Sequence, residues 1–587
     1  MHSSAPSPEA WLRRRGVLRP FGRRRVVAGA VMLSALPLVG SAQAQGGGEP
    51  DVILSGMFIT LDAALPRAEA IAVRRGIIAA VGTRAHVDST AGPTTRRLDI
   101  PGVALPGFAD AHVHTLALGE LLETLDLHGL SKAEVLGRVR RAAAAAPAGQ
   151  WIRGAGWDQA LWRPPEFPTA AELDSVSAGH PVLLDRIDQH AAWLNSRALR
   201  LAGITRERAD PVGGRIIRDA DGAPTGVLVD SAVALATRVV PAPDAEALER
   251  RLRAALAQYA AWGLTSVHDA GASLRELAAF RSLAAEGALP VRIYAMAVAR
   301  DSTLARTLAR GPEVGVGGGM LTIRSVKVVL DGALGSRGAE LRAPYSDAPA
   351  ERGLVLASDA TVDSILRVAT ARGFQVSVHA IGDEANRRLL DAVERAGAAG
   401  RALRVRDEHA SMVRDEDVPR FARLGVIASM QPVFVGEYSR FAEDRVGPAR
   451  VASVYRTRDL LERGTVIASG TDFPASDAGD PVSTLFSMVT RRGADGTPRA
   501  GWQPNQRVTV DAALRSMTAG PAYAAFQERE LGALTVGRAA DVTVLSADPY
   551  ALPPDQLRSL RVLMTIVAGR TTYRARESPA GRVAPRR

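Results

Sequence analysis

Apolar residues in the middle of the chain fall into short runs, each of which follows a longer amphipathic segment and a glycine. The helix expected before Gly373, for example, leads into the apolar run of residues 374–379. The same order of helix, glycine and strand recurs around Gly263, Gly425 and Gly464. A glycine directly after a helix supplies the left-handed cap that turns the chain into the next strand. The repeated pattern therefore predicts parallel βα units.

Eight apolar runs can serve as the strands of one parallel sheet. Eight parallel strands separated by helices predict a (β/α)8 TIM-like barrel, in which functional side chains lie at the carboxyl ends of the strands. A doubly wound open sheet is the structural alternative. The expected strands are residues 109–114, 265–269, 291–297, 326–330, 376–379, 405–409, 426–430 and 466–469.

The remaining segments of the chain show other patterns of helix and strand. Residues 116–255 show no regular alternation of helix and strand, so we expect a large insertion after the first strand of a barrel that spans residues 105–529. Residues 46–104 and 530–573 both consist of short β runs separated by glycine turns. We therefore expect the two chain ends to pair into one small β-sandwich domain beside the barrel.

Residues 1–44 have the pattern of a signal peptide. Arginines precede an apolar run of 14 residues that begins at Val26, and the small-x-small cleavage motif Ala42-Gln43-Ala44 follows it. The run is too short for a comfortable membrane span. Arg14-Arg15 resembles the start of a twin-arginine export motif, with a Sec signal or an uncleaved anchor as the alternatives. We expect an exported protein, periplasmic or secreted, with no stable membrane span after cleavage.

Charge and cysteine content narrow the partners and the chemistry. The formal net charge is +11, but residues 1–25 contribute +6 and residues 574–587, expected to form a disordered basic tail, contribute +4. The remaining body carries no basic face for a phosphate backbone, so we expect a small-molecule substrate and no nucleic-acid partner. The chain has no cysteine, which excludes thiolate ligands and leaves His, Asp, Glu or a modified Lys for any metal. The oligomeric state stays open, with a homodimer as one option.

Polar residues stand at the carboxyl ends of the expected strands. His112 and His114 lie two positions apart on an extended strand, so they point to the same face and can reach one metal ion together. Lys327 lies in a β-branched run, where a buried ammonium is costly unless it is ion-paired or has reacted with CO2 to form a carbamate. The remaining strand ends carry His379, His409 and Asp472.

This order of residues resembles the pattern of the amidohydrolase superfamily, and in particular its amidohydrolase-3 (YtcJ-like) branch. The resemblance extends over about residues 50–572 and includes the segments Leu105-Pro106-Gly107-Phe108 and Gly470-Thr471-Asp472. It also includes His379-Ala380-Ile381-Gly382-Asp383 and Glu408-His409. In combination these motifs are specific, and they imply a barrel with a flanking β domain and a hydrolytic metal centre.

The resemblance implies a centre of one or two divalent ions, with zinc (Zn2+) as the default metal. Asp472 is implied to be the catalytic residue that orients an activated water, takes its proton and passes it to the leaving amine. Lys327 would bridge two ions as a carbamate, and its alternative is a salt bridge to Asp331 beside a single ion. The implied ligands are His112, His114, Lys327, His379, His409 and Asp472.

Three further residues are candidates for substrate contact. His190, in the insertion, matches a segment that reaches the pocket in similar proteins, with local packing as its alternative. His268 ends the second expected strand, and a structural hydrogen bond is the alternative for it. Trp157 is a candidate for lining the pocket, with packing in a core or lid as the alternative.

Two neighbours of the expected ligands have other interpretations. Glu408 precedes His409 on the same strand, so alternation predicts that it points to the opposite face and is structural. Phe434 stands where the branch often has a histidine after the seventh strand, and this departure indicates a different substrate.

The sequence thus predicts a metal-dependent hydrolase of a carbon–nitrogen bond other than a peptide bond, with an amide or cyclic amide as substrate. Lactone or ester hydrolysis and deamination are alternatives that use the same site. An exported solute-binding protein on a decayed scaffold is the alternative from another class. The complete set of expected ligands argues against this last alternative, because decay usually removes a ligand.

Overall fold

A computed structural model of the protein describes residues 49–576, except residues 128, 160–161, 187–190, 212–213 and 231. The expected signal peptide, His190 and most of the expected basic tail therefore lie outside the described residues. The chain divides into two compact units, one formed by Leu116–Ala255 and the other by the residues before and after it. Within the described part, no helix is long and apolar enough to cross a membrane.

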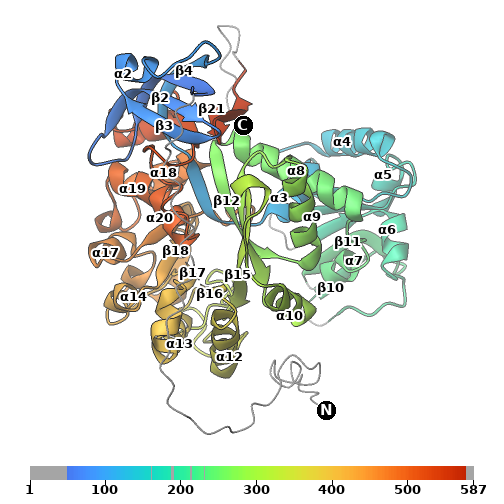
Figure 1. Ribbon diagram of the computed structural model, residues 1–587. Coiled ribbons are helices and arrows are strands. Elements are labelled where there is room, and N and C mark those ends of the chain that lie inside the picture. The colour runs from blue at the N-terminus through green and yellow to red at the C-terminus, as the bar shows by residue number, and fades with distance from the viewer. Residues whose placement is uncertain are drawn as a thin grey trace. The chain divides into compact units, whose positions relative to one another are not determined.

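The larger unit contains a barrel of parallel strands (Figure 1). Each strand pairs with the next along the chain, and the last returns to the first: the amide of His114 donates to the carbonyl of Phe473 (3.1 Å). This confirms the predicted barrel. Its strands are β5 (Phe108–Val113), β12 (Leu264–Ala272), β13 (Arg292–Val298), β15 (Leu321–Val329), β16 (Gln375–Ala380), β17 (Arg406–His409), β18 (Ile427–Met430) and β19 (Ile467–Ser469), and β14 (Glu313–Gly315) pairs with β15 at its edge.

Helices on the outside of the barrel connect these strands. The four glycines predicted to cap them, Gly263, Gly373, Gly425 and Gly464, all have positive φ angles, between 69° and 91°. The glycine caps are thus confirmed as the points where helices turn into strands. The helices of this unit include α8 (Ala245–Ala261), which begins in the insertion, α9 (Leu274–Ala285), α10 (Asp301–Arg310), α11 (Val316–Gly319), α12 (Asp359–Thr370), α13 (Asp383–Ala402), α14 (Val418–Leu424), α15 (Phe434–Tyr438), α16 (Ala442–Val446), α17 (Thr457–Glu462), α18 (Pro481–Thr490), α19 (Val510–Ser516) and α20 (Ala519–Ala524).

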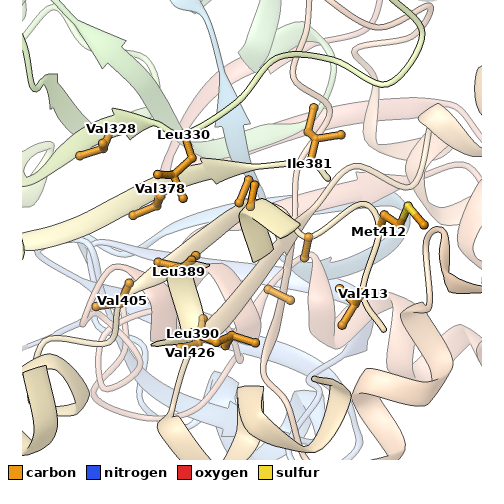
Figure 2. Close-up of a cluster of buried hydrophobic side chains, with 14 of the residues drawn as sticks. Val328, Leu330, Val378, Ile381, Leu389, Leu390, Val405, Met412, Val413 and Val426 are labelled. Carbon is orange, nitrogen blue, oxygen red and sulfur yellow. The ribbon is translucent and has the colours of Figure 1, made fainter. Parts of the chain in front are cut away.

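Alternation along the strands separates a packing face from a functional face. Val328 of β15 and Val378 of β16 belong to one buried cluster with Leu389 of α13, as Figure 2 shows. Because neighbouring side chains of a strand point to opposite faces, Lys327 and His379 lie on the inner face of the barrel. The apolar outer face, which packs against the helices, therefore fixes the direction of these two polar side chains.

Both ends of the described chain form one small β domain, where blue and red strands lie side by side in Figure 1. The sheet folds over a shared apolar core that includes Phe58 and Ile566. Its opposite ends approach each other near Ala540, whose amide donates to the carbonyl of Gly76 (2.8 Å) and whose carbonyl accepts from the amide of Gly569 (2.9 Å). The strand order is β22 (Arg570–Arg574), β21 (Val562–Val567), β20 (Val542–Leu545), β4 (Arg96–Pro106), β1 (Val52–Ile59), β2 (Arg67–Arg74) and β3 (Ile77–Gly82), accompanied by α2 (Arg84–Asp88).

The insertion after β5 folds around a sheet of its own. Its strands β6, β7 and β8 are parallel and are connected through helices, a βα rhythm that the sequence pattern did not indicate. The reason is that β6 has only two residues, too few to form a visible apolar run. The sheet order is β10 (Gly214–Arg218), β11 (Pro224–Asp230), β9 (Ala191–Leu194), β8 (Val182–Arg186), β7 (Ile152–Trp157) and β6 (Leu125–Asp126), and the helices are α3 (Thr115–Glu123), α4 (Lys132–Ala145), α5 (Ala170–Asp174), α6 (Ser196–Leu201) and α7 (Val233–Thr237).

Candidate active site

The structure brings the residues predicted as ligands together at the carboxyl ends of the barrel strands. The ring centroid of His112 lies 5.5 Å from that of His114 and 4.9 Å from that of His409. The rings of His379 and His409 lie 4.3 Å apart. Asp472 completes the group, because its Oδ1 lies 3.0 Å from His114 Nε2 and 3.4 Å from His112 Nε2. Residues from four strand ends thus meet in one place.

The donor atoms of three of these residues converge tightly. His112, His409 and Asp472 each offer one ligand atom, and these atoms lie within 4.8 Å of one another. The Nδ1 atoms of the two rings are already engaged, since His112 Nδ1 lies 2.6 Å from Glu408 Oε2 and His409 Nδ1 lies 2.8 Å from Gln431 Oε1. Both partners accept hydrogen bonds, so each ring carries a proton on Nδ1 and leaves Nε2 as the nitrogen that can bind a metal.

Asp472 reaches this position because the end of the eighth strand closes over the first. The amide of Asp472 donates to the carbonyl of His112 (2.7 Å), and its backbone has a φ of 61°. Gly470 permits the approach, because a Cβ at this position would lie 2.5 Å from the backbone nitrogen of His112. Asp110 adds a clamp: its carboxylate accepts from the amide and hydroxyl of Thr471 (3.0 and 2.7 Å) and from the amide of His112 (3.0 Å). The sequence analysis did not identify this role of Asp110.

Lys327 lies buried beside the histidines. Its Nζ is 3.4 Å from His112 Nε2, and burial lowers the pKa of the amine. No salt bridge joins Lys327 to a carboxylate of the described residues, so the expected alternative, a pair with Asp331, is wrong. The carboxylate of Asp331 instead accepts from three backbone amides, including those of Ile381 (3.0 Å) and Gly382 (2.7 Å). A buried amine without a carboxylate partner is the setting in which reaction with CO2 would replace a costly ammonium by a carbamate anion that bound cations would stabilise.

The electrostatics of the group fit a divalent cation. Burial is the main cause that lowers the pKa of His379 well below its usual value and that of His409 to about 3, so both rings are neutral, as metal ligands must be. His379 Nε2 is buried without a hydrogen-bond partner among the described residues, and the nearest carboxylate oxygen, Asp331 Oδ1, is 3.7 Å away. Burial would raise the pKa of Asp472, but His112 and His114 hold it well below its usual value. The neutral rings of His379 and His409 beside the ionised carboxylate of Asp472 provide donors for a metal such as zinc.

Glu408 does not point away from the site as alternation predicted. It lies inside the barrel, where its Oε1 is 2.7 Å from Arg406 Nε and its Oε2 contacts the ring of His112. The cause is the backbone of His409 and Ala410, whose φ angles of 98° and 42° depart from strand geometry. His409 is thereby turned toward the same side as Glu408, and the alternation rule fails at the end of this strand.

The profile of the amidohydrolase family matches residues 102–573. The chain belongs to the amidohydrolase family. It is 33% identical over 520 residues to YtcJ of Bacillus subtilis (strain 168), whose name assigns it to the amidohydrolases; the match covers 86% of this chain and 96% of YtcJ. An N-substituted formamide deformylase of Arthrobacter pascens is 29% identical over 544 residues, which cover 89% and 98% of the two chains.

A solved structure agrees with this assignment. An uncharacterized metal-dependent hydrolase from Pyrococcus horikoshii OT3 superposes with a TM-score of 0.71 at 28% identity, covering 86% of this chain and 99% of that one. The protein is therefore a metal-dependent hydrolase of the amidohydrolase family, and one of its relatives is named an N-substituted formamide deformylase.

Within this amidohydrolase, Trp157 is not placed to contact a substrate, and that expectation is wrong. Its side chain is fully buried in the core of the insertion. The ring stacks on Trp162 at 5.8 Å and meets the edge of Trp193 at 6.1 Å, while its Nε1 donates to the carbonyl of Leu184 (2.8 Å). Three indoles packed around one another form a core, which the alternative interpretation had anticipated.

The structure also favours the structural alternative for His268. The residue is 1% exposed, and its Nδ1 lies 2.9 Å from Nη1 of Arg406. Because a guanidinium only donates, Nδ1 accepts this bond. His268 thus supports the buried ion pair beneath the site instead of facing its mouth. His190 lies outside the described residues, and its contact with substrate stays a prediction.

Proposed function

We propose that the protein hydrolyses the C–N bond of a small amide, with N-acyl and N-formyl amines as the first substrate class to test and cyclic amides as the second. The observation that carries the proposal is the convergence of His112, His409 and Asp472 at the carboxyl ends of barrel strands, where this fold places its chemistry. The relative named as an N-substituted formamide deformylase supports an amide as the target.

The metal would be held by the ligands expected from the sequence. A bound divalent ion supplies a Lewis acid for the carbonyl and makes a water molecule acidic enough to attack at neutral pH. His112 and His114 would hold the buried position together with Asp472, whereas His379 and His409 would hold a second position. Lys327 would join the two positions as a carbamate, since its amine lies buried 3.4 Å from His112 Nε2.

Asp472 is the residue that we assign to proton transfer. Its side chain is 11% exposed, so it borders the site while remaining largely shielded from solvent. The neighbouring His112 and His114 keep the carboxylate ionised despite its burial, as its low pKa indicates. An ionised carboxylate at the site can accept a proton from the attacking water and deliver it to the leaving nitrogen. Without that delivery an amine is a poor leaving group.

Zinc and export complete the proposal. Zinc is the metal that we expect, because the donors are imidazoles, carboxylates and a modified amine without any thiolate. Export is supported by the arginine-rich and apolar pattern of residues 1–44. Metal analysis of the purified protein and amino-terminal sequencing of the mature chain from the periplasmic or secreted fraction test these two points. An unprocessed chain confined to the cytoplasm would contradict export.

A substrate panel tests the reaction itself. The zinc-loaded protein should release amine from N-formyl or N-acyl amines and lose this activity after treatment with a chelator. Lactones, esters and aminated heterocycles in the same panel represent the alternative reactions at this site. Turnover of these compounds without any amide hydrolysis would replace the proposal by one of the alternatives. Mass spectrometry of the native protein at neutral pH, with and without added bicarbonate, tests whether Lys327 gains CO2.

A further inference from the structure

We propose that Glu408 is a positioning residue, which holds His112 with its proton on Nδ1 and thereby strengthens cation binding at the buried side of the site. The inference rests on the metal centre of the proposed function and adds a residue outside the expected ligand set. Glu408 touches neither the converging donor atoms nor the mouth of the site. It acts on the centre through the imidazole of His112.

The contact between the two side chains determines the tautomer. Glu408 Oε2 and His112 Nδ1 lie 2.6 Å apart, and both side chains are at most 1% exposed. An ionised carboxylate can only accept a hydrogen bond, so Nδ1 must carry the proton. Nε2 then faces Asp472, whose Oδ1 lies 3.4 Å away, and is the nitrogen whose lone pair can bind a metal. Without Glu408 the ring could take the other tautomer, which has no lone pair to offer on that side.

Arg406 keeps Glu408 ionised and in place. Its Nε lies 2.7 Å from Glu408 Oε1, so the guanidinium supplies a counter-charge to the carboxylate inside the barrel. The guanidinium is in turn anchored, since Nη2 donates to the carbonyl of Ala111 (2.6 Å) and to the hydroxyl of Ser429 (3.0 Å). This chain of contacts crosses the inside of the barrel from β17 to β5.

Stability alone does not explain why the barrel buries an ion pair of this kind. Arg406 and Glu408 are both fully buried, in an interior that barrels usually fill with branched apolar side chains. Removing two charges from water costs free energy that their attraction often fails to recover. The pair is explained if the carboxylate of Glu408 is needed at His112. A carboxylate that accepts a hydrogen bond from a metal-binding imidazole orients the ring and makes it more basic.

The second converging histidine provides an internal comparison. His409 Nδ1 lies against an amide oxygen, that of Gln431, whose Nε2 donates to the carbonyl of Ser429 (2.9 Å) and so fixes which end of the amide faces the ring. His409 therefore has the same tautomer as His112 without a negative charge behind it. The two histidines therefore differ in the charge of the group that accepts from Nδ1. Replacing the carboxylate of Glu408 by an amide should make the surroundings of His112 similar to those of His409.

The substitution Glu408→Gln tests the proposal, because it keeps the size of the side chain and removes the charge. Glu313→Gln is the matched control: Glu313 is partly buried, pairs with Arg281 (2.6 Å) and Arg310 (3.0 Å), and forms no ion pair with a histidine of the described chain. Zinc affinity is measured by competition with a chelator, and the cobalt-substituted proteins are compared by visible spectroscopy. We expect a zinc dissociation constant about 10–100-fold higher in Glu408→Gln, an altered cobalt spectrum and wild-type values in the control.

The outcomes separate this inference from the proposed function. A wild-type protein that binds no metal would contradict the proposed function, whereas a wild type and a Glu408→Gln variant of equal affinity and spectrum would overturn only the role of Glu408. If Glu313→Gln weakened zinc binding to the same extent, the effect would be a general destabilisation, and the role of Glu408 would be overturned as well.

The single variant leaves Arg406 without its counter-charge, so circular dichroism of the metal-free protein must show that it folds. If it does not, the double variant Arg406→Gln with Glu408→Gln removes both charges together. The same loss of zinc affinity is expected there, and a folded double variant with wild-type affinity overturns the proposal.

Discussion

The interior of the barrel and the core of the insertion are built from opposite kinds of side chain. Beneath the site, the barrel holds the charged pair Arg406 and Glu408, fully buried. The insertion instead packs three indoles around one another, those of Trp157, Trp162 and Trp193. Each of these indoles donates its N–H to a backbone carbonyl at 2.8–3.0 Å, so its polar atom is satisfied locally.

The difference shows what each interior contributes. A buried tryptophan removes roughly 150–250 Å² of surface from water and stabilises its unit by several kcal/mol. A buried ion pair adds little net stability unless its geometry and hydrogen bonds are complete. The charged interior is therefore explained by the chemistry above it, and the aromatic core by the stability of the insertion. Substitutions in the two regions should separate activity from stability.

The substitution Asp472→Asn should have the largest effect and leave the fold intact. Asparagine tolerates the left-handed backbone at this position, where φ is 61°, so the native conformation is retained. The amide cannot accept the proton that the reaction requires, and we expect kcat/KM to fall about 10³-fold or more. Steady-state kinetics and urea unfolding measure the two effects. Activity within tenfold of the wild type would remove Asp472 from the role of base.

The substitution Trp157→Ala should act in the opposite way. Removing a fully buried indole from the insertion should lower the free energy of unfolding by about 3–5 kcal/mol. The zinc content and kcat of the folded protein should stay near the wild-type values. Phe167→Ala is the control in the same unit, because this ring is 39% exposed and its loss should cost little. A raised KM with unchanged stability would indicate that Trp157 contacts the substrate.

Most of the barrel, and the polar residues at its strand ends, could be predicted because both depend on local patterns. The apolar runs, the glycines after helices and the polar residues at strand ends each depend on a few neighbouring positions. His112 and His114 need only the alternation of one strand to share a face. The closure of the eighth strand over the first, which brings Asp472 to them, follows once eight such strands are counted.

What could not be predicted depends on contacts between distant segments. Alternation placed Glu408 on the wrong face, because the left-handed backbone of His409 and Ala410 arises from the surrounding fold and has no local signal. Trp157 was misassigned because its partner Trp193 lies on another strand of the insertion sheet. The alternative for Lys327, a salt bridge to Asp331, could not be excluded from the sequence, because the backbone amides that bond to the carboxylate of Asp331 come from later in the chain.

The substitution His268→Phe tests whether the charged interior extends to the second strand. Phenylalanine cannot accept the hydrogen bond from Arg406, which would leave Nη1 buried without a partner. We expect a loss of about 1–3 kcal/mol in stability. KM should not change, because the ring is 1% exposed. Chemical unfolding and steady-state kinetics provide the two readouts, and a raised KM at unchanged stability would make His268 a substrate contact after all.

Substitution of Glu437 should have the smallest effect on stability, and its surroundings contrast most clearly with those of Glu408. It is a half-buried carboxylate on α15 that accepts from the amide of Asp477 (2.8 Å) and forms no salt bridge within the described chain. Burial raises its pKa from 4.5 to about 7, whereas Arg406 and His112 hold the pKa of Glu408 low despite burial. Glu408 and Glu437 thus differ in whether a cationic side chain lies against the carboxylate.

The sign of the pH dependence follows from the raised pKa. Between pH 4.5 and about 7 the native state keeps a proton on Glu437 that the unfolded state has lost, so this residue lowers stability as pH rises through that window. The substitution Glu437→Gln removes the titration and keeps the bond from Asp477. At pH 8 we expect the variant to be more stable than the wild type by about 1–2 kcal/mol after allowance for solvent screening, with a difference near zero at pH 4.

Urea unfolding of both proteins across this pH range isolates the contribution of Glu437, because all other groups cancel in the difference. Glu443→Gln, at an exposed position on the nearby helix α16, is the control for removing a surface carboxylate. A difference between wild type and Glu437→Gln that stays constant with pH would show that this carboxylate is ionised in the native state. The contrast with Glu408 would then lie in packing alone, since both carboxylates would carry their charge.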